Sequence, residues 1–180
     1  MTPDALRRSV WALLTLAVVA GDQASKHQIR LTMALHDSVS IVPGLFSLTH
    51  VANRGALFGM LRDLPDPWRS MLFTLVPLGA IALIIYFQLR TPLGDAAAHT
   101  GLALILGGAL GNLADRVRLG YVTDFLDVYL SDHHWPAFNV ADSSICVGVS
   151  LLVLSLLLAR REAAPTGVPP EEARDASRPV

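Results

Sequence analysis

Two aspartates, Asp124 and Asp142, stand beside apolar stretches of this chain, where a carboxylate is costly to keep. Asp124 lies in a polar motif that begins at Val122, and Asp142 runs directly into the apolar stretch 145–159. Two carboxylates held close together cannot both ionise cheaply, so they share a proton, and the ionised one can activate a water molecule. The residue types therefore predict shared-proton chemistry.

Polar residues gather in five clusters, and an even number of membrane crossings brings all five to one side. A single polar cluster at a helix end is ordinary, whereas five from separate segments indicate a site. The clusters are Asp22-Gln23-Ala24-Ser25-Lys26, Asn53-Arg54-Gly55-Ala56, Asn112-Leu113-Ala114-Asp115-Arg116, Val122-Thr123-Asp124-Phe125 and Asn139-Val140-Ala141-Asp142.

Two of these clusters have structural interpretations that remain open. Asp22 and Lys26 are four residues apart, which on a helix fits a plain ion pair. Asn139 and Asp142 have the spacing of a helix N-cap and its third residue, and acids are favoured at a helix start. Capping alone could therefore account for Asp142.

The remaining polar residues have similar alternatives. Asn112, Asp115 and Arg116 could satisfy one another at a helix end. Asp127 lies one turn from Asp124 if that segment is helical, and we expect it to be solvated or structural. The adjacent histidines at 133–134 are a weak metal signal, but their surroundings indicate an interfacial loop, and no zinc-type ligand set accompanies them. We expect no metal and no cofactor.

The elements that must position these residues are membrane helices. The chain has 180 residues, of which 52% are hydrophobic and 16% charged, below the quarter usual for soluble domains. The apolar residues concentrate in four blocks, at 10–21, 71–89, 96–113 and 145–159. These blocks predict an all-α membrane protein with four transmembrane helices. The net charge of −1 gives no basic patch, so we expect no nucleic-acid partner.

The third block carries four glycines at positions 101, 107, 108 and 111, which predict a central, closely packed helix. The first block has a rival interpretation as a cleavable signal peptide, because two arginines precede a short apolar run. We favour an uncleaved helix. The lone Cys146, inside the fourth block, excludes a disulfide framework and indicates a small buried hydrophobe.

The segments between and after the blocks complete the organisation. A β-rich insert at about 37–62 contains the β-forming run 39–51, broken by Pro43-Gly44, which predicts a hairpin or curved strands. Residues 56–61 are apolar and could lie on the membrane surface. Residues 1–161 form the predicted membrane domain, and the tail at 162–180 lacks an apolar period and is predicted to be disordered.

Basic residues are equally numerous on the two predicted sides of the membrane, so a plain count by the positive-inside rule does not decide the orientation of the chain. Arg54 and Arg116 lie inside polar motifs, where a structural role competes with a topological one. Leaving them out favours cytoplasmic termini.

Together the motifs around Asp22, Asn53, Asn112, Asp124 and Asp142 resemble those of the bacterial lipoprotein signal peptidases (signal peptidase II), in the same order, over residues 10–160. The resemblance implies a four-helix inner-membrane aspartic endopeptidase with a small β cradle outside the bilayer. It implies cleavage of prolipoprotein signal peptides just before a diacylglyceryl-modified cysteine.

The resemblance also implies the roles of individual residues. Asp124 and Asp142 correspond to the two catalytic aspartates. The supporting polar set, to which we add Arg54 from the second cluster, comprises Asp22, Lys26, Asn53, Arg54, Asn112, Asp115, Arg116 and Asn139. The expected partners are lipid-modified prolipoprotein signal peptides and membrane lipids, and nothing requires more than a monomer.

A second class of function stays open from the residues alone. A small cation or proton transporter could use a path of acids that includes Asp22, Asp115, Asp124 and Asp142. Such a path needs polar residues at several depths of the membrane. The centres of the blocks 71–89 and 96–113 offer none, which favours the peptidase.

Overall fold

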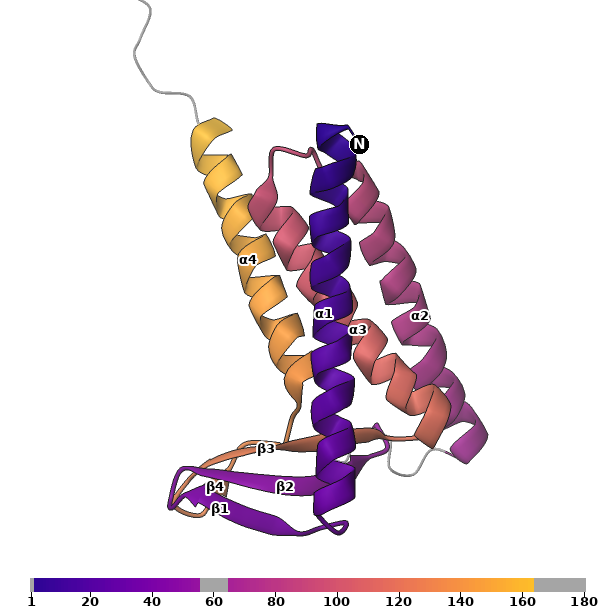
Figure 1. Cartoon of the computed structure of the whole chain (residues 1–180), viewed down its shortest axis with the longest axis vertical. Helices are drawn as coiled ribbons and strands as arrows, with labels where there is room; N and C mark the ends of the chain where they lie inside the picture. The colour runs from indigo at the N-terminus through magenta and orange to yellow at the C-terminus, as the bar shows by residue number, and fades with distance from the viewer. Residues whose placement is uncertain (1, 56–64, 164–180) are drawn as a thin grey trace, which may run out of the picture.

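The computed structural model describes residues 2–55 and 65–163, and in this part of the chain four helices stand on a small sheet (Figure 1). The helices are α1 (Pro3–Thr32), α2 (Asp66–Arg90), α3 (Ala96–Leu119) and α4 (Val140–Ala163). The start of α1 and the end of α4 are both at the end of the bundle opposite the sheet. The predicted surface segment at 56–61 and the tail beyond residue 163 lie outside the described residues.

Four antiparallel strands form the sheet in the order β1-β2-β3-β4. The strands are β1 (Ser38–Val42), β2 (Phe46–Asn53), β3 (Val122–Leu130) and β4 (His133–His134). The first two confirm the hairpin predicted around Pro43-Gly44. The other two were not expected: the segment after Asp124 is a strand and not a helix, and the histidines at 133–134 pair with β3 instead of forming a loop.

The strand β3 forms because β-branched and aromatic residues recur along it, and because β2 pairs with it in the antiparallel direction over most of its length. The register places Val51 opposite Asp124 and Asn53 opposite Val122, after an irregularity between Leu48 and Val51. This pairing joins a segment that precedes α2 to one that follows α3. It fixes Asp124 at the edge of the bundle.

Helix α3 is central, as its glycines predict, and packs against α1, α2 and α4. At Gly101 an added Cβ would meet the backbone oxygen of Gly148 on α4, and at Gly107 it would meet Val18 on α1. At Gly111 it would lie 2.5 Å from the Asp22 carboxylate. Small residues therefore let α3 approach two neighbours at once.

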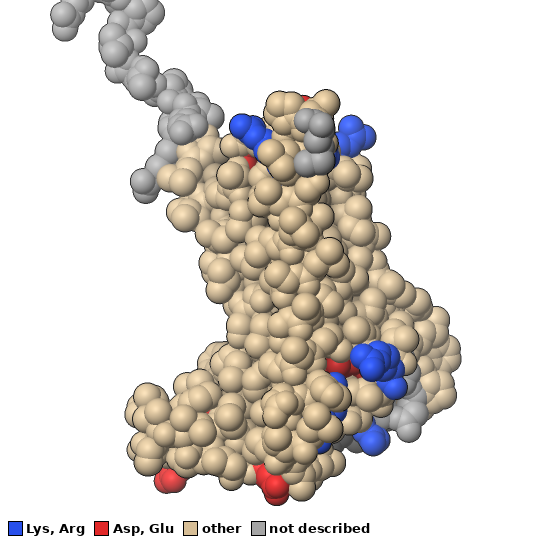
Figure 2. All heavy atoms as spheres, viewed as in Figure 1, with Lys and Arg blue, Asp and Glu red and all other residues tan. Residues whose placement is uncertain are grey.

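Apolar side chains cover the outside of the bundle. Leu75 and Val76 on α2 and Leu157 on α4 are half or more exposed. Figure 2 shows charged side chains at the two ends of one face and none across its middle. Among the described residues, three helical segments are long and apolar enough to cross a membrane, at Met71–Arg90, Ala96–Leu119 and Val140–Ala159. An uncovered apolar belt of this kind is typical of a membrane protein.

Candidate active site

Asp124 and Asp142, here called the aspartate pair, come from different elements and meet where the sheet joins the bundle. Asp124 is 2% exposed on β3, and Asp142 lies in the first turn of α4. Two asparagines connect them. Asn139 Nδ2 donates to Asp124 Oδ1 at 2.7 Å and to Asn112 Oδ1 at 3.2 Å, and Asn112 Nδ2 donates to Asp142 Oδ1 at 2.8 Å. The chain thus brings the two predicted carboxylates into one hydrogen-bond network.

The start of α4 orients Asp142 by a reciprocal cap. The backbone N–H of Asp142 donates to Asn139 Oδ1 at 3.0 Å, and the backbone N–H of Asn139 donates to Asp142 Oδ2 at 3.2 Å. This confirms the predicted capping interpretation. The cap uses one carboxylate oxygen and leaves the other for Asn112, so capping and a place in the site are compatible.

Asp124 is oriented from the side of the sheet by Asn53. Asn53 Nδ2 donates to Asp124 Oδ2 at 2.9 Å, while Asn53 Oδ1 accepts the backbone N–H of Gly55 at 2.9 Å. Gly55 has a φ of 95°, in the left-handed region that glycine adopts without a steric penalty. The turn at Gly55 therefore presents the amide nitrogen of Asn53, and not its oxygen, to the carboxylate.

Burial raises the pKa of Asp124 from the ordinary 3.8 to about 6, and the negative charge of Asp142 adds to the rise. The hydrogen bonds from Asn53 and Asn139 act in the opposite direction because they stabilise the charged form. A carboxyl group that holds its proton to near-neutral pH can act as a general acid under mild conditions.

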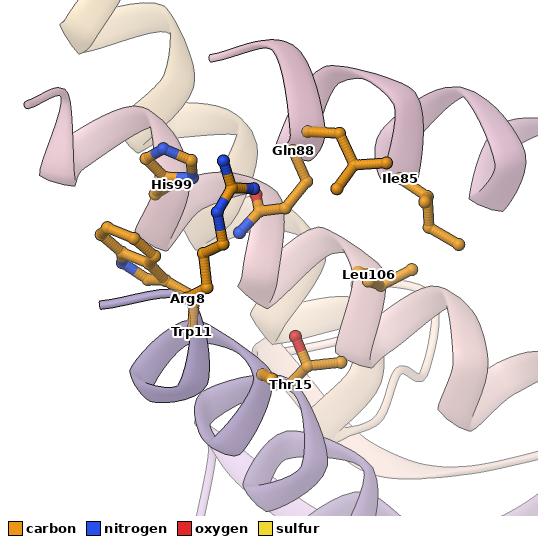
Figure 3. Close-up of a pocket in the computed structure, with 9 residues that line it drawn as sticks. Arg8, Trp11, Thr15, Ile85, Gln88, His99 and Leu106 are labelled. Carbon is orange, nitrogen blue, oxygen red and sulfur yellow. The ribbon is translucent and has the colours of Figure 1, made fainter. Parts of the chain in front are cut away.

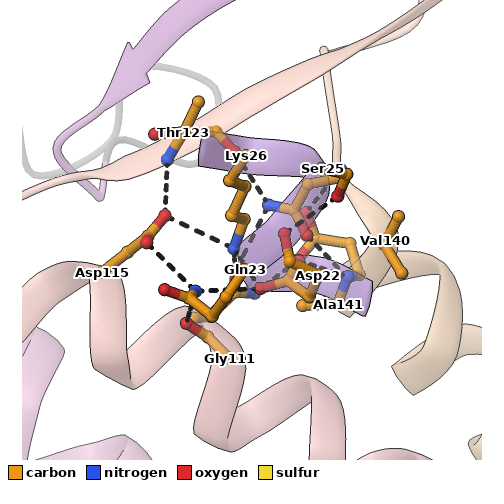
Figure 4. Close-up of polar contacts among 12 residues, drawn as sticks. Asp22, Gln23, Ser25, Lys26, Gly111, Asp115, Thr123, Val140 and Ala141 are labelled. Carbon is orange, nitrogen blue, oxygen red and sulfur yellow. Dashed lines mark hydrogen bonds and ion pairs between the residues drawn. The ribbon is translucent and has the colours of Figure 1, made fainter. Parts of the chain in front are cut away.

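Behind the pair lies a buried ionic cluster, here called the Lys26 cluster, formed by Lys26, Asp22 and Asp115 (Figure 4). Lys26 Nζ lies 2.8 Å from Asp22 Oδ2 and 3.4 Å from Asp115 Oδ2, and all three side chains are at most 1% exposed. Lys26 also donates to Asn112 Oδ1 at 2.8 Å. The predicted ion pair on α1 is confirmed, and it extends to a second carboxylate.

The two acids of the Lys26 cluster each hold a backbone N–H next to the aspartate pair. Asp22 Oδ1 accepts from the N–H of Ala141 at 2.9 Å, and Asp115 Oδ2 accepts from the N–H of Thr123 at 3.0 Å (Figure 4). Ala141 directly precedes Asp142, and Thr123 directly precedes Asp124. One buried lysine therefore ties together the anchors of both aspartates.

One structural interpretation was wrong: Asn112, Asp115 and Arg116 do not satisfy one another. Asn112 bonds Lys26 and α4, Asp115 bonds Lys26 and β3, and the Arg116 guanidinium lies 5.6 Å from the centre of the Phe73 ring on α2. The physical reason is that α3 is surrounded, so each polar side chain finds its partner on a different neighbour.

Most of the predicted supporting residues join the network around the aspartate pair, as the contacts above show for Asp22, Lys26, Asn53, Asn112, Asp115 and Asn139. Arg54 differs, because its side chain is exposed at the end of β2. Arg116 also differs, because its guanidinium lies against the aromatic ring on α2, and its positive charge acts on Asp142 and Asp124 without a hydrogen bond to either.

Three further residues belong to the network and were not in the predicted set. Arg30 Nη1 donates to Thr123 Oγ1 at 2.9 Å and lies 3.7 Å from Asp115 Oδ1. Gln23 Nε2 donates to Asp115 Oδ1 at 3.2 Å. Spacing could have identified Arg30, which follows Asp22 and Lys26 at intervals of four and so lies on the same helix face.

Asp127 and His134, further along the sheet, form a group separate from the aspartate pair. Asp127 Oδ1 lies 3.0 Å from His134 Nδ1, and the His134 ring stacks on Tyr129 with 4.5 Å between centroids. Asp127 therefore has a structural role, which is one of the two roles expected for it from the sequence. In the part of the chain that the structure describes, no group of three or more His, Cys, Asp or Glu side chains is placed to hold a metal ion.

The family model described as Signal peptidase (SPase) II matches residues 14–158. The chain belongs to this family. It is similar to the lipoprotein signal peptidase of Geobacter sulfurreducens, with 51% identity over 155 residues that cover 83% of this chain and 94% of that protein. It is 40% identical to the lipoprotein signal peptidase of Solibacter usitatus, over 90% of this chain and 98% of that one.

Two solved structures of bacterial membrane enzymes share the fold of this chain. A bacterial membrane enzyme determined by the in meso method at 2.3 Å superposes with a TM-score of 0.77 and 30% identity, covering 89% of this chain and 95% of that one. A second, determined at 1.9 Å, superposes with a TM-score of 0.73. The family consists of aspartic peptidases, so the chain is a hydrolase, and the transporter alternative is not favoured.

Proposed function

We propose that this chain removes signal peptides from diacylglyceryl-modified prolipoproteins by cleaving just before the lipidated cysteine, with Asp124 and Asp142 as the catalytic residues. The observation that carries the proposal is the link between the two carboxylates through Asn112 and Asn139 at the end of the bundle. Membership of the signal peptidase II family supports the choice of substrate.

In the proposed mechanism the two carboxyl groups divide the proton work. Each carboxylate accepts two N–H donors, but Asp142 also lies in the first turn of α4, where the helix dipole favours a negative charge, so it fits the base that takes a proton from water. Asp124, whose pKa burial raises to about 6, carries the shared proton. It hydrogen-bonds the scissile carbonyl oxygen as water attacks, and a proton then passes to the leaving amine.

The proposed placement in the membrane makes α1 the fourth spanning helix. Leu13 and Leu16 on α1 are each 63% exposed, so this helix adds an apolar outer surface to the three candidate spans. The helix is continuous past residues 18–20, which fits an uncleaved anchor. We place the sheet and aspartate pair on the outer face of the bacterial inner membrane and both termini in the cytoplasm.

The lipid on the substrate supports recognition at this depth. The aspartate pair lies at the end of the candidate span Val140–Ala159, so a substrate whose acyl chains stay in the bilayer delivers its scissile bond close to it. Each buried CH₂ contributes about 0.8 kcal/mol, so the acyl chains contribute several kcal/mol to binding. All the residues of the network come from one chain, and we propose a monomer as the active unit.

The test is cleavage of a lipidated precursor peptide by purified protein in detergent. Asp124→Asn and Asp142→Asn should each remove cleavage, because each deletes one partner in proton transfer. Asp127→Asn is the matched control, since Asp127 lies on the same strand but pairs with His134. Near-normal turnover by either variant of the pair would refute the catalytic assignment. Equal cleavage of acylated and unacylated precursors would refute the proposed role of the lipid.

A further inference from the structure

A cavity of about 210 Å³ (Figure 3) is lined by residues from the first half of α1, which begins at the end of the bundle opposite the sheet (Figure 1). Helices α1, α2 and α3 each contribute to its lining. Its polar lining residues are Arg8, Thr15, Gln88 and His99, and its apolar ones include Trp11 and Ile85. Figure 3 shows the side chains of Arg8, Gln88 and His99 turned toward the same space.

His99 is the unusual group in this cavity. Its side chain is 1% exposed and stacks on Trp11 with 4.1 Å between ring centroids. Neither ring nitrogen has a hydrogen-bond partner within the described part of the chain, and the same holds for Oε1 of Gln88. Buried polar atoms without partners cost free energy, so these atoms need water or a ligand as their hydrogen-bond partner.

The nearby carboxylate does not supply the missing contacts. Asp95, at the start of α3, accepts the backbone N–H of Ala98 at 2.8 Å with Oδ1 and the hydroxyl of Ser155 at 2.7 Å with Oδ2. Both oxygens are therefore engaged in capping α3 and joining it to α4. The partners of His99 and Gln88 must come from inside the cavity.

The lining defines the chemistry of the ligand. A neutral imidazole needs one acceptor and one donor, Gln88 Oε1 needs a donor, and the Arg8 guanidinium favours an anion. The rest of the lining is largely apolar, from Ile85, Leu89 and Leu106. A ligand that meets all these needs has an anionic phosphodiester, free hydroxyl groups and a hydrocarbon chain.

We propose that this cavity binds an anionic phospholipid with a hydroxyl-bearing headgroup, of the phosphatidylglycerol type. The phosphodiester pairs with Arg8, headgroup hydroxyls donate to Gln88 Oε1 and contact the His99 ring, and an acyl chain starts along Ile85 and Leu106. Basic pockets between helices at a membrane surface commonly bind anionic lipids in this way. The site is separate from the proposed substrate site and does not depend on its chemistry.

The experiment is native mass spectrometry of the full chain, released from micelles that contain equal amounts of phosphatidylglycerol and phosphatidylethanolamine with identical acyl chains. Wild type should retain the anionic lipid preferentially. Arg8→Gln should lower this preference about fivefold, the factor that one arginine contributes near a membrane surface. His99→Phe, which keeps an aromatic ring against Trp11, should also lower retention. Arg7→Gln is the matched control, because Arg7 is exposed on the same turn and does not line the cavity.

Four outcomes would overturn the proposal. Equal retention of the two lipids by wild type would show that the cavity does not select the anionic lipid. An unchanged preference in Arg8→Gln, or a loss as large in Arg7→Gln, would assign the preference to general surface charge. Displacement of the lipid by millimolar inorganic phosphate would identify a site for free anions. Cleavage of a lipidated precursor by Arg8→Gln should match wild type and serves as the check that the variant is folded.

Discussion

Asn139 donates its side-chain N–H to Asp124 Oδ1 at 2.7 Å, so the residue that caps helix α4 also holds strand β3. The same residue donates its backbone N–H to Asp142. One asparagine therefore sets the position of both carboxylates relative to each other. A change at Asn139 therefore affects the cap of α4, the position of β3 and the protonation of Asp124 together.

Asn139→Ser separates these roles, because serine still caps a helix but cannot donate to Asp124 as the amide does. We expect cleavage to fall about 10²-fold, within the range that a positioned acid or base contributes. The Asn139 hydrogen bond lowers the pKa of Asp124, so its loss should move the alkaline limb of the kcat/KM profile to higher pH. A slower enzyme with an unmoved profile would show that the residue acts through packing alone.

Asp124 should make the stability of the protein depend on pH. Its pKa in the folded protein is about 6, above the 3.8 of an unfolded chain, so the folded state binds more protons between these values. The stabilisation is fully present below about pH 4 and is lost as the pH rises through 6, by about 3 kcal/mol. Thermal unfolding in detergent at pH 5 and 7.5 should show a larger pH slope for wild type than for Asp124→Asn. Equal slopes would contradict the burial argument.

Lys26→Met should destabilise the fold strongly, since it leaves Asp22 and Asp115 buried without their shared cation. Breaking a buried ion pair on one side costs about 3–5 kcal/mol. Arg30→Gln is the control: Arg30 lies farther from Asp115, at 3.7 Å, and is partly exposed, so about 1 kcal/mol is expected. Thermal unfolding of each variant measures the loss of stability. A smaller effect at Lys26 than at Arg30 would mean that the Lys26 cluster does not stabilise the fold.

Gly111→Ala tests the close approach of α3 to α1. The new Cβ would lie 2.5 Å from Asp22 Oδ2, the oxygen that pairs with Lys26, so the carboxylate must shift within its contacts with Lys26 and with the N–H of Ala141. We expect a loss of about 1–3 kcal/mol in stability and reduced cleavage. Gly79→Ala on α2 is the matched control, because its Cβ would meet nothing within 4 Å. If the two variants unfold at the same temperature, the contact at Gly111 is not under constraint.

Truncation after residue 163 should leave cleavage nearly unchanged. The family match ends at residue 158, and the network around the aspartate pair lies wholly before the end of α4. Cleavage by the truncated chain, compared at equal amounts of inserted protein, is the measurement. A large loss of activity would assign the tail a role in the enzyme.

Local patterns predicted the parts of the site that depend on local geometry. The spacing of Asp22 and Lys26 predicted an ion pair, and the spacing of Asn139 and Asp142 predicted a cap; both are present. The β-rich run with Pro43-Gly44 predicted the first hairpin, and the glycines of α3 predicted its central position. For the ion pair, the cap and the hairpin, helix or turn geometry alone determines which atoms can meet, and for α3 the small side chains permit close packing.

Contacts between distant segments were not predictable in the same way. Strand β3 has the β-branched and aromatic residues of a strand, but its partner β2 lies about seventy positions earlier in the chain. The polar motif around Asp124 indicated a functional site and not a strand. The partners of Asn112 and Asp115 depend on which helix faces which side of α3, and the local spacing of polar residues does not indicate that arrangement. Asp22 holding the N–H of Ala141 is a contact of the same kind.

The pairing of β2 with β3 has a consequence for biosynthesis. During synthesis β2 is made before α2 and α3. Strand β3 with Asp124 follows them, and helix α4 with Asp142 is made last. Neither carboxylate has its full set of neighbours until the last helix has entered the bundle and its first turn has met Asp22. A partly made chain therefore has no assembled aspartate pair, and the proposed catalytic centre exists only once the last helix is in place.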